Sequence, residues 1–192
     1  MSPIPPEYEL REVERLEEPR FTELLTEGVL GRSSHIPLDE LRAPLSDEAR
    51  ALRRRRGMCR LGVYQGAALV AFSVGWQEFD DRFYMAASVV DPAHRRRGLY
   101  RALAEAVVER ARAAGYSQVW SRHVATNNPI LIAKLKLGFR ITGVELCAAH
   151  GVMVHLAYAL DPAEAEALDV RAGLKKAPGA WAEWLIEGAK RG

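Results

Sequence analysis

Cysteines and long apolar runs are scarce in this sequence, and each shortage excludes a class of protein. Only two of the 192 residues are cysteine, and Cys59 and Cys147 match no metal-binding spacing. We therefore expect no metal site and a reduced, cytoplasmic protein rather than a disulfide-linked secreted one. No stretch has the length of a membrane span, and residues 1–6 contain no apolar signal segment, so we expect no membrane partner.

An excess of charge is also lacking. The 27 Lys and Arg residues are balanced by 25 Asp and Glu residues, which gives a net charge of +2. Arginine runs at residues 53–56 and 95–97 would fit nucleic acid locally. The near-neutral net charge of the chain and the lack of a nucleic-acid-binding motif argue against a nucleic-acid partner. The first run is typical of the solvated last turn of a helix, where cations complement the helix dipole.

Apolar residues make up 48% of the chain, enough for a core, and their periodicity predicts a mixed architecture. Alternation predicts strands over residues 8–13, 58–64, 67–76, 82–90, 117–125, 140–146 and 152–160, with an acidic loop over 77–81. Helical periodicity predicts short helices between residues 19 and 56, the last opening at Ser46, and longer helices over 99–114 and 128–137, the second with Asn128 as its N-cap. This order is typical of an α/β (α+β) fold, a mixed sheet with helices on both faces.

The chain divides into one domain and a tail by this pattern. We expect the domain to span residues 1–160 and a helical extension to span residues 161–192. The extension carries an apolar stripe at Trp181, Trp184 and Leu185. Such a stripe either packs back on the domain or forms the contact between two copies in a homodimer.

The segment with the clearest chemistry is Arg95-Arg96-Arg97-Gly98-Leu99-Tyr100, which joins a predicted strand to a predicted helix. The first N–H groups of a helix have no partners within it and, with the positive end of its dipole, form a phosphate site. Gly98 has no Cβ, so a ligand can approach the backbone closely. Arginines are unfavourable at a bare helix N-terminus, so three of them predict a bound anion. The alternative is a solvated, arginine-rich helix start.

This loop resembles the acetyl-CoA pyrophosphate loop of the GNAT acetyltransferase superfamily. The family has Gln or Arg at the position of Arg95 and a glycine at that of Gly98, whereas Tyr100 replaces a small residue. A second stretch, residues 127–139, resembles the family's Asn-led helix that ends in Lys-Leu-Gly-Phe. The resemblance covers about residues 58–160. It implies a mostly antiparallel sheet with a V-shaped splay between two central strands.

The resemblance also implies that acetyl-CoA is the cosubstrate and that it lies in this splay. Its pantetheine would pair with backbone groups of one strand, its pyrophosphate would bind the loop, and the Asn-led helix would contact its other side. The implied CoA-binding residues are Ser88, Val89, Val90, Arg95, Arg96, Arg97, Gly98, Leu99, Tyr100 and Asn128. The implied reaction is direct attack on the thioester by a primary amine of a small molecule or peptide, with a backbone N–H stabilising the oxyanion.

Such a reaction needs a base for the substrate ammonium and an acid for the departing thiolate. The family often has a tyrosine acid four residues before the glycine of Gly-Phe, where this sequence has Lys134. A lysine can neutralise a thiolate, and its alternative role is that of a solvated helix residue. For the base, the resemblance favours Glu78, and the pKa of histidine favours His123. The alternative role of Glu78 is that of a charged loop residue, and the alternative role of His123 is that of a half-buried structural histidine.

The departures from the family pattern leave a second function open, a non-catalytic acyl-CoA-binding module. Tyr100 and Lys134 stand where the family has other residues, and the strand over 82–90 contains no carboxylate. Release of the CoA thiol in the presence of an amine would separate the enzyme from the module. The region from residue 19 to 56 is expected to form the acceptor wall, but its residues indicate no particular substrate.

Overall fold

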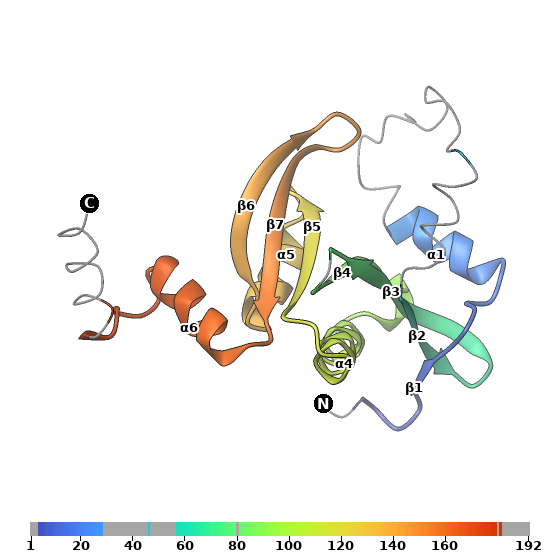
Figure 1. Ribbon diagram of the computed structural model, residues 1–192. Helices are drawn as coiled ribbons and strands as arrows, with labels where there is room; N and C mark the ends of the chain where they lie inside the picture. The colour runs from blue at the N-terminus through green and yellow to red at the C-terminus, as the bar shows by residue number, and fades with distance from the viewer. Residues whose placement is uncertain (1–3, 29–45, 47–56, 80, 180, 182–192) are drawn as a thin grey trace.

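The computed structural model describes residues 4–28, 46, 57–79, 81–179 and 181. Its centre is a seven-stranded sheet in the order β1-β2-β3-β4-β5-β7-β6, and helices lie on both of its faces (Figure 1). Neighbouring strands are antiparallel except β4 and β5, which are parallel. The strands are β1 (Glu9–Glu12), β2 (Met58–Gln65), β3 (Ala68–Glu78), β4 (Arg82–Val90), β5 (Gln118–Val124), β6 (Arg140–Cys147) and β7 (Gly151–Ala159). The predicted mixed, mostly antiparallel sheet is confirmed.

The larger core lies between one face of the sheet and the helix α4 (Leu99–Ala113). Apolar residues at helical spacing give α4 a buried face that contacts β2, β3, β4 and β5. The helix α5 (Asn128–Lys136) lies on the same face, and Phe139, just after it, is fully buried in the same core. Gly138 ends α5 with a φ of +99°, a conformation that favours glycine.

A second, smaller core lies on the opposite face beneath α1 (Arg20–Gly28). Leu24 of α1 is fully buried against Phe72 and Val89, and the ring of Phe21 meets that of Phe72 edge-on at 4.8 Å. The helices predicted between residues 19 and 56 are represented by α1. The predicted helix from Ser46 lies outside the described residues, apart from Ser46 itself.

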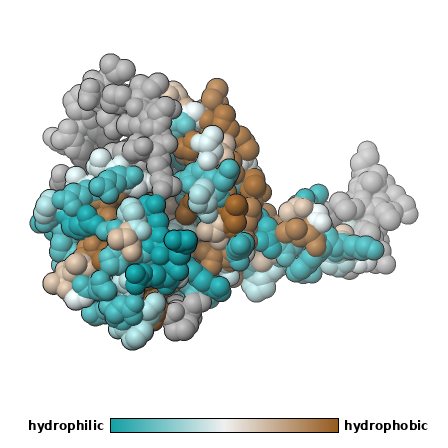
Figure 2. All heavy atoms as spheres, turned by 180° about the vertical axis from the view of Figure 1, so that it is seen from behind, coloured by the Kyte–Doolittle hydropathy of each residue, from teal (hydrophilic) through white to brown (hydrophobic). Residues whose placement is uncertain are grey.

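The last described helix, α6 (Pro162–Arg171), projects from the end of β7 (Figure 1). Asp161 caps its first N–H groups, and Arg140 Nε donates to Asp169 Oδ1 at 2.7 Å. Trp184 and Leu185 of the predicted apolar stripe lie outside the described residues, so the homodimer stays a prediction. Exposed apolar side chains gather instead along the edge strand β6 and its neighbour, as Figure 2 shows, at Ile141, Val144, Leu146 and Val152. No described helix has the length and apolarity to cross a bilayer.

Two details of the sequence prediction are wrong. The loop between β3 and β4 is shorter than predicted, because β3 continues to Glu78 and pairs that residue with Arg82. The N-cap of α5 is Asn127 rather than Asn128, which is already the first helical residue. In the first case strand pairing extends β3 to Glu78, a residue type typical of loops. In the second case helical geometry includes Asn128, a residue type typical of caps.

Candidate active site

The parallel pairing of β4 and β5 ends early, which opens a splay inside the sheet. Residues 82–84 pair with residues 118–120, whereas β4 continues to Val90 and β5 to Val124. Beyond Trp120, β5 pairs only with β7 among the described strands. Backbone groups along this edge of β4 are therefore available to a ligand. The V-shaped splay predicted between these two strands is confirmed.

A β-bulge in β4 lies where the splay begins. Gly75 pairs with Met85 and Val74 pairs with Ala87, so Ala86 has no partner on β3. The extra residue shifts the side-chain alternation of the strand. Met85 accordingly packs in the core under α4, whereas Ala87 packs against the core under α1. The bulge thus puts irregular backbone, with an unpaired residue, at the mouth of the splay.

The loop after β4 places two residues with positive φ ahead of α4. Arg96 has a φ of +61°, and Gly98, the N-cap of α4, has a φ of +79°. A glycine cap offers no side chain to the first-turn N–H groups of α4, which stay available. Left-handed residues next to right-handed ones turn successive N–H groups to one side and form an anion-binding concavity. A Cβ on Gly98 would meet no atom within 4 Å, so backbone conformation requires the glycine.

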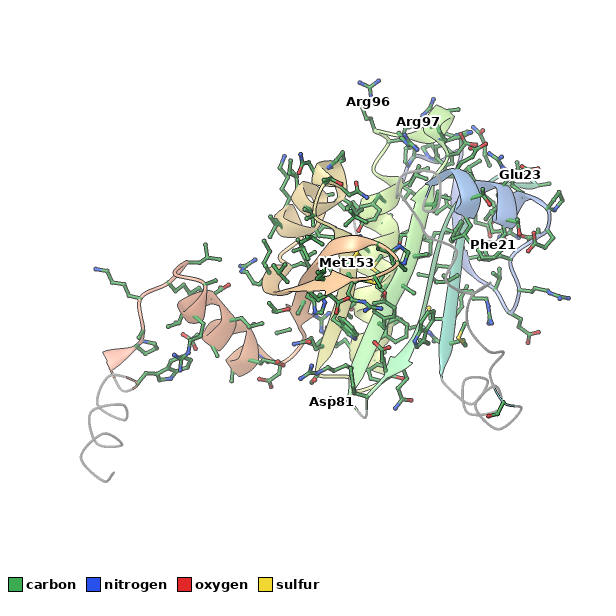
Figure 3. All side chains as sticks on the ribbon, turned by 90° about the horizontal axis from the view of Figure 1, so that it is seen from above. Phe21, Glu23, Asp81, Arg96, Arg97 and Met153 are labelled. Carbon is green, nitrogen blue, oxygen red and sulfur yellow. The ribbon has the colours of Figure 1, made fainter. Side chains whose placement is uncertain are left out.

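Positive charge gathers around this concavity. Arg95, Arg96 and Arg97 are all exposed. The Nε of Arg95 donates to the carbonyl oxygen of Val90 at 3.2 Å, which holds that side chain against the end of β4. Figure 3 shows Arg96 and Arg97 at one end of the sheet and Asp81 at the other. The geometry therefore offers free N–H groups, a helix dipole and guanidinium groups to one anion.

Leu99 and Tyr100 contribute backbone rather than side chains to this loop. Leu99 is fully buried in the core under α4, and the ring of Tyr100 packs against the same core. The Tyr100 Oη is buried and has no hydrogen-bond partner among the described residues. This burial raises the pKa of Tyr100 well above its ordinary value. The tyrosine that departs from the family pattern therefore leaves the anion site open.

The predicted pantetheine contacts on β4 likewise use their side chains for the fold. The Oγ atoms of Ser88 and Ser73 are 2.9 Å apart across β3 and β4. Val89 is buried beneath α1, and Val90 packs against the core on the other face. These three residues can offer only backbone groups to a ligand. Asn128 is exposed at the start of α5.

Lys134 is a buried cation at the mouth of the splay. Its side chain is almost wholly buried; its Nζ donates to Met85 Sδ at 3.2 Å and lies 4.1 Å from the ring centroid of Phe139. No carboxylate pairs with it among the described residues. Burial disfavours the ammonium and lowers the pKa of Lys134 to about 7. The alternative of a solvated helix residue is therefore wrong.

His123 and Glu78, the two predicted bases, lie in different surroundings. Burial, and then the charge of Lys134, lowers the pKa of His123 to about 3. Its Nε2 is buried and has no hydrogen-bond partner in the described part of the chain. Glu78 ends β3, and its Oε2 is also buried without a donor among the described residues. His123 thus stays neutral near pH 7, while Glu78 holds an acceptor without a partner.

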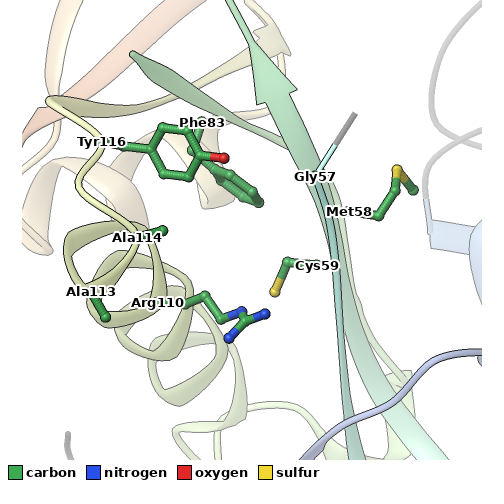
Figure 4. Close-up of a pocket in the computed structure, with 8 residues that line it drawn as sticks. All are labelled: Gly57, Met58, Cys59, Phe83, Arg110, Ala113, Ala114 and Tyr116. Atoms are coloured by element: carbon green, nitrogen blue, oxygen red, sulfur yellow. The ribbon is translucent and has the colours of Figure 1, made fainter. Parts of the chain in front are cut away.

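A pocket of about 220 Å³ lies away from the splay, between β2 and the far end of α4 (Figure 4). It is lined by Cys59, Arg110 and Tyr116, among others. Burial raises the pKa of the Cys59 thiol, which disfavours a reactive thiolate. Among the described residues, no three His, Cys, Asp or Glu side chains are placed to hold a metal ion.

The sequence matches the family model described as the acetyltransferase (GNAT) family over residues 11–139. The chain belongs to this family. It is a GNAT-type acyltransferase, and its cosubstrate is acetyl-CoA. The match includes the strands of the splay, the loop at Gly98 and α5 with Lys134. No curated protein sequence matches the chain significantly.

Solved structures share the fold of this GNAT protein at low sequence identity. The ribosomal-protein-S18-alanine N-acetyltransferase from Escherichia coli is 17% identical, with a TM-score of 0.61 over 80% of this chain and 94% of that chain. The putative acetyltransferase yncA from Salmonella typhimurium, solved with acetyl-CoA, is 20% identical, with a TM-score of 0.62 over 80% and 94%. A Bacillus subtilis acetyltransferase in complex with CoA is 15% identical, with a TM-score of 0.60 over 80% and 99%.

The structure brings together most, but not all, of the residues predicted for the site. The loop from Arg95 to Tyr100 and the backbone of β4 lie along one end of the splay, and Lys134 lies at its mouth. Sequence reasoning missed the bulge at Ala86 and the contact between Lys134 and Met85. No local signal marks either, since both depend on neighbouring elements. The sequence does not separate an Asn127 cap from an Asn128 cap, because either places Pro129 in the first helical turn, where its missing N–H has no partner to lose.

Proposed function

We propose that this acetyltransferase transfers the acetyl group of acetyl-CoA to a primary amine by direct attack. The observation that carries the proposal is the loop around Gly98, whose free N–H groups lie at the end of the splay between β4 and β5. In this proposal the pyrophosphate binds these N–H groups and Arg95, Arg96 and Arg97. The pantetheine follows the backbone of Ser88, Val89 and Val90, and Asn128 borders it from α5. The relative solved with acetyl-CoA supports this ligand.

Lys134 is the acid in this mechanism. When the amine attacks the thioester carbon, the C–S bond breaks and leaves a thiolate. A lysine with a pKa of about 7 is partly protonated near neutral pH, so its ammonium can give the thiolate a proton. The position at Met85 and the lack of a carboxylate partner among the described residues support this role.

Glu78 is the base that takes the proton of the substrate ammonium through bridging waters, because its register partner Arg82 lies four residues before Ala86 on β4. An imidazole whose pKa is lowered to about 3 is a weak base, which places His123 behind Glu78. The oxyanion of the tetrahedral intermediate is stabilised by a backbone N–H at the bulge around Ala86. One such preorganised donor commonly lowers the activation free energy by about 3 kcal/mol.

The test combines turnover with two pairs of variants. Release of the CoA thiol from acetyl-CoA is measured over a panel of primary amines. Gly98→Val should weaken acetyl-CoA binding at least about tenfold, because a β-branched residue strains a positive φ and crowds the anion site. Gly115→Val is the matched control. Gly115 has a φ of +80° and open space around its Cβ position, but it lies at the other end of α4. Both variants should lose similar stability, and only the first should lose affinity.

Lys134→Met tests the acid, since methionine retains an unbranched apolar side chain. It should keep acetyl-CoA affinity and lower kcat about 100-fold. Tight acetyl-CoA binding without turnover of any amine would contradict acetyl transfer and favour the binding module. Equal acetyl-CoA affinity of Gly98→Val and Gly115→Val would contradict the loop assignment.

A further inference from the structure

Three aromatic side chains form a continuous row across the centre of the sheet. Trp76, Tyr84 and Trp120 are register partners on the adjacent strands β3, β4 and β5. The ring centroids of Trp76 and Tyr84 are 5.2 Å apart, and those of Tyr84 and Trp120 are 4.7 Å apart. Phe83 and Val119, which alternate with them, pack under α4. The aromatic row therefore lies on the face opposite α4.

The aromatic row is not explained by core packing. Neither of the two apolar cores of the described residues contains its members. Trp76 and Trp120 are half-buried, and Phe79 extends the row at 6.4 Å from Trp120 with 66% of its surface exposed. Large aromatic rings left partly open side by side commonly mark a binding surface.

Charged groups frame the aromatic row on two sides. On one side the Arg122 guanidinium lies 5.6 Å from the Tyr84 ring centroid and 5.8 Å from that of Trp120. Its Nη1 donates to Glu145 Oε1 at 2.9 Å, so this cation is already neutralised. On the other side Glu78 makes no ion pair within the described residues, and its Oε2 has no donor. Glu78 pairs in register with Arg82, so its carboxylate lies on the side of the row away from the splay.

The aromatic row also lies beside the reacting centre of the proposed mechanism. Tyr84 and Trp120 are the last paired residues before the splay, and the bulge at Ala86 follows directly. An acceptor that rests on the row therefore reaches the thioester from the face opposite Lys134. Its body would lie against the indole rings and its amine toward the bulge at Ala86.

From this juxtaposition we infer the class of the acceptor: a primary amine joined by a short chain to a flat aromatic ring. The inference rests on the proposed function and names its substrate. A flat ring rests on the aromatic row, and its short chain carries the amine from the row to the splay. A polyamine would leave the indole faces uncovered.

The kinetic test compares three acceptors at saturating acetyl-CoA. 2-Phenylethylamine is matched by 2-cyclohexylethylamine, which has the same chain and a non-planar ring, and by spermidine, a cationic chain. We expect kcat/KM for 2-phenylethylamine to exceed both others by about fivefold or more, because stacking on one or two rings contributes that much. Equal or higher efficiency with either comparison amine overturns the inference and leaves acetyl transfer standing.

Variants of the row identify the surface that recognises the ring. Trp120→Leu should raise KM for 2-phenylethylamine about tenfold and leave the acetyl-CoA KM unchanged, while Trp120→Phe should restore most of the preference. Trp181→Leu, in the tail, is the matched control and should change neither value. A lost preference for 2-phenylethylamine in Trp181→Leu, or an unchanged preference in Trp120→Leu, contradicts the assignment.

A binding measurement keeps the two proposals separate. Titration of the CoA complex with 2-phenylethylamine should quench tryptophan fluorescence, and Trp120→Leu should abolish the saturable part of the signal. Saturable quenching without turnover of any amine supports this surface and contradicts acetyl transfer. Absence of quenching at concentrations that saturate turnover contradicts the surface alone.

Discussion

At the scale of single residues, side-chain direction decides whether a departure from the family pattern matters. Tyr100 stands where a small residue is expected, and the sequence cannot tell whether its ring enters the anion site. In the structure the ring packs under α4, since the first turn of the helix already faces the sheet there. Gly98 and Arg95, by contrast, were predictable, because a positive φ and a charge act through the local chain.

Tyr100→Phe tests the cost of the buried hydroxyl. A buried polar atom without a partner costs about 1 kcal/mol or more, so its removal should raise the free energy of unfolding by about 1 kcal/mol. Acetyl-CoA affinity should not change. Urea unfolding and calorimetric titration measure the two quantities.

The matched control is Tyr64→Phe, which should act in the opposite direction. The Tyr64 hydroxyl donates to Glu17, and burial raises the pKa of Tyr64 to about 12. Its removal leaves a carboxylate without that donor and lowers stability by about 1 kcal/mol. A loss of stability in Tyr100→Phe would show that the hydroxyl has a partner.

At the scale of elements, alternation located most strands but not their irregularities. The bounds of β4 were predicted correctly, yet the bulge at Ala86 depends on the fit between two strands. A Cβ on Gly75 would lie 2.5 Å from the carbonyl oxygen of Tyr84 and from the Phe83 ring. Glycine there lets β4 approach β3 closely at the bulge.

Gly75→Ala should therefore displace β4 where the splay begins. We expect the free energy of unfolding to fall by about 1–3 kcal/mol, as for an overpacked site, with weaker acetyl-CoA binding. Gly143→Ala in β6 is the control, because its Cβ would meet His155 at an ordinary 3.8 Å. Urea unfolding and acetyl-CoA titration compare the two. Equal, small effects would show that the close approach is not required.

At the scale of the whole molecule, the order of strands and helices together with the family resemblance predicted the fold, whereas the burial of a charged side chain was not predictable. The apolar residues of α5 show no clear helical periodicity, so only the contacts of Lys134 with Met85 and Phe139 reveal that it is removed from water. The same limit applies to the aromatic row. Its members lie far apart in sequence and meet because three strands share one register.

Burial of Lys134 should make stability depend on pH. Its pKa is about 7 in the folded chain against 10.5 unfolded, so the unfolded chain binds more protons between these values. Its contribution to the free energy of unfolding should therefore rise with pH from about 7 to about 10.5. Lys134→Met should be more stable than the parent at pH 7 and should lack this rise.

Urea unfolding of both proteins at pH 7 and 9.5 measures the difference. The comparison between variants removes the changes that other titrating groups share. A constant gap between the two proteins across this range would mean that Lys134 keeps an ordinary pKa.

The splay also divides the sheet into two plates, β1 to β4 and β5 with β7 and β6, that share three pairs of residues. Of the helices, α4 contacts both plates. A ligand that pairs with the free edge of β4 and reaches α5 therefore bridges the two plates. Binding of the cosubstrate should therefore also make the molecule more rigid. Without it, the junction between the two plates should be the first part to open by local unfolding.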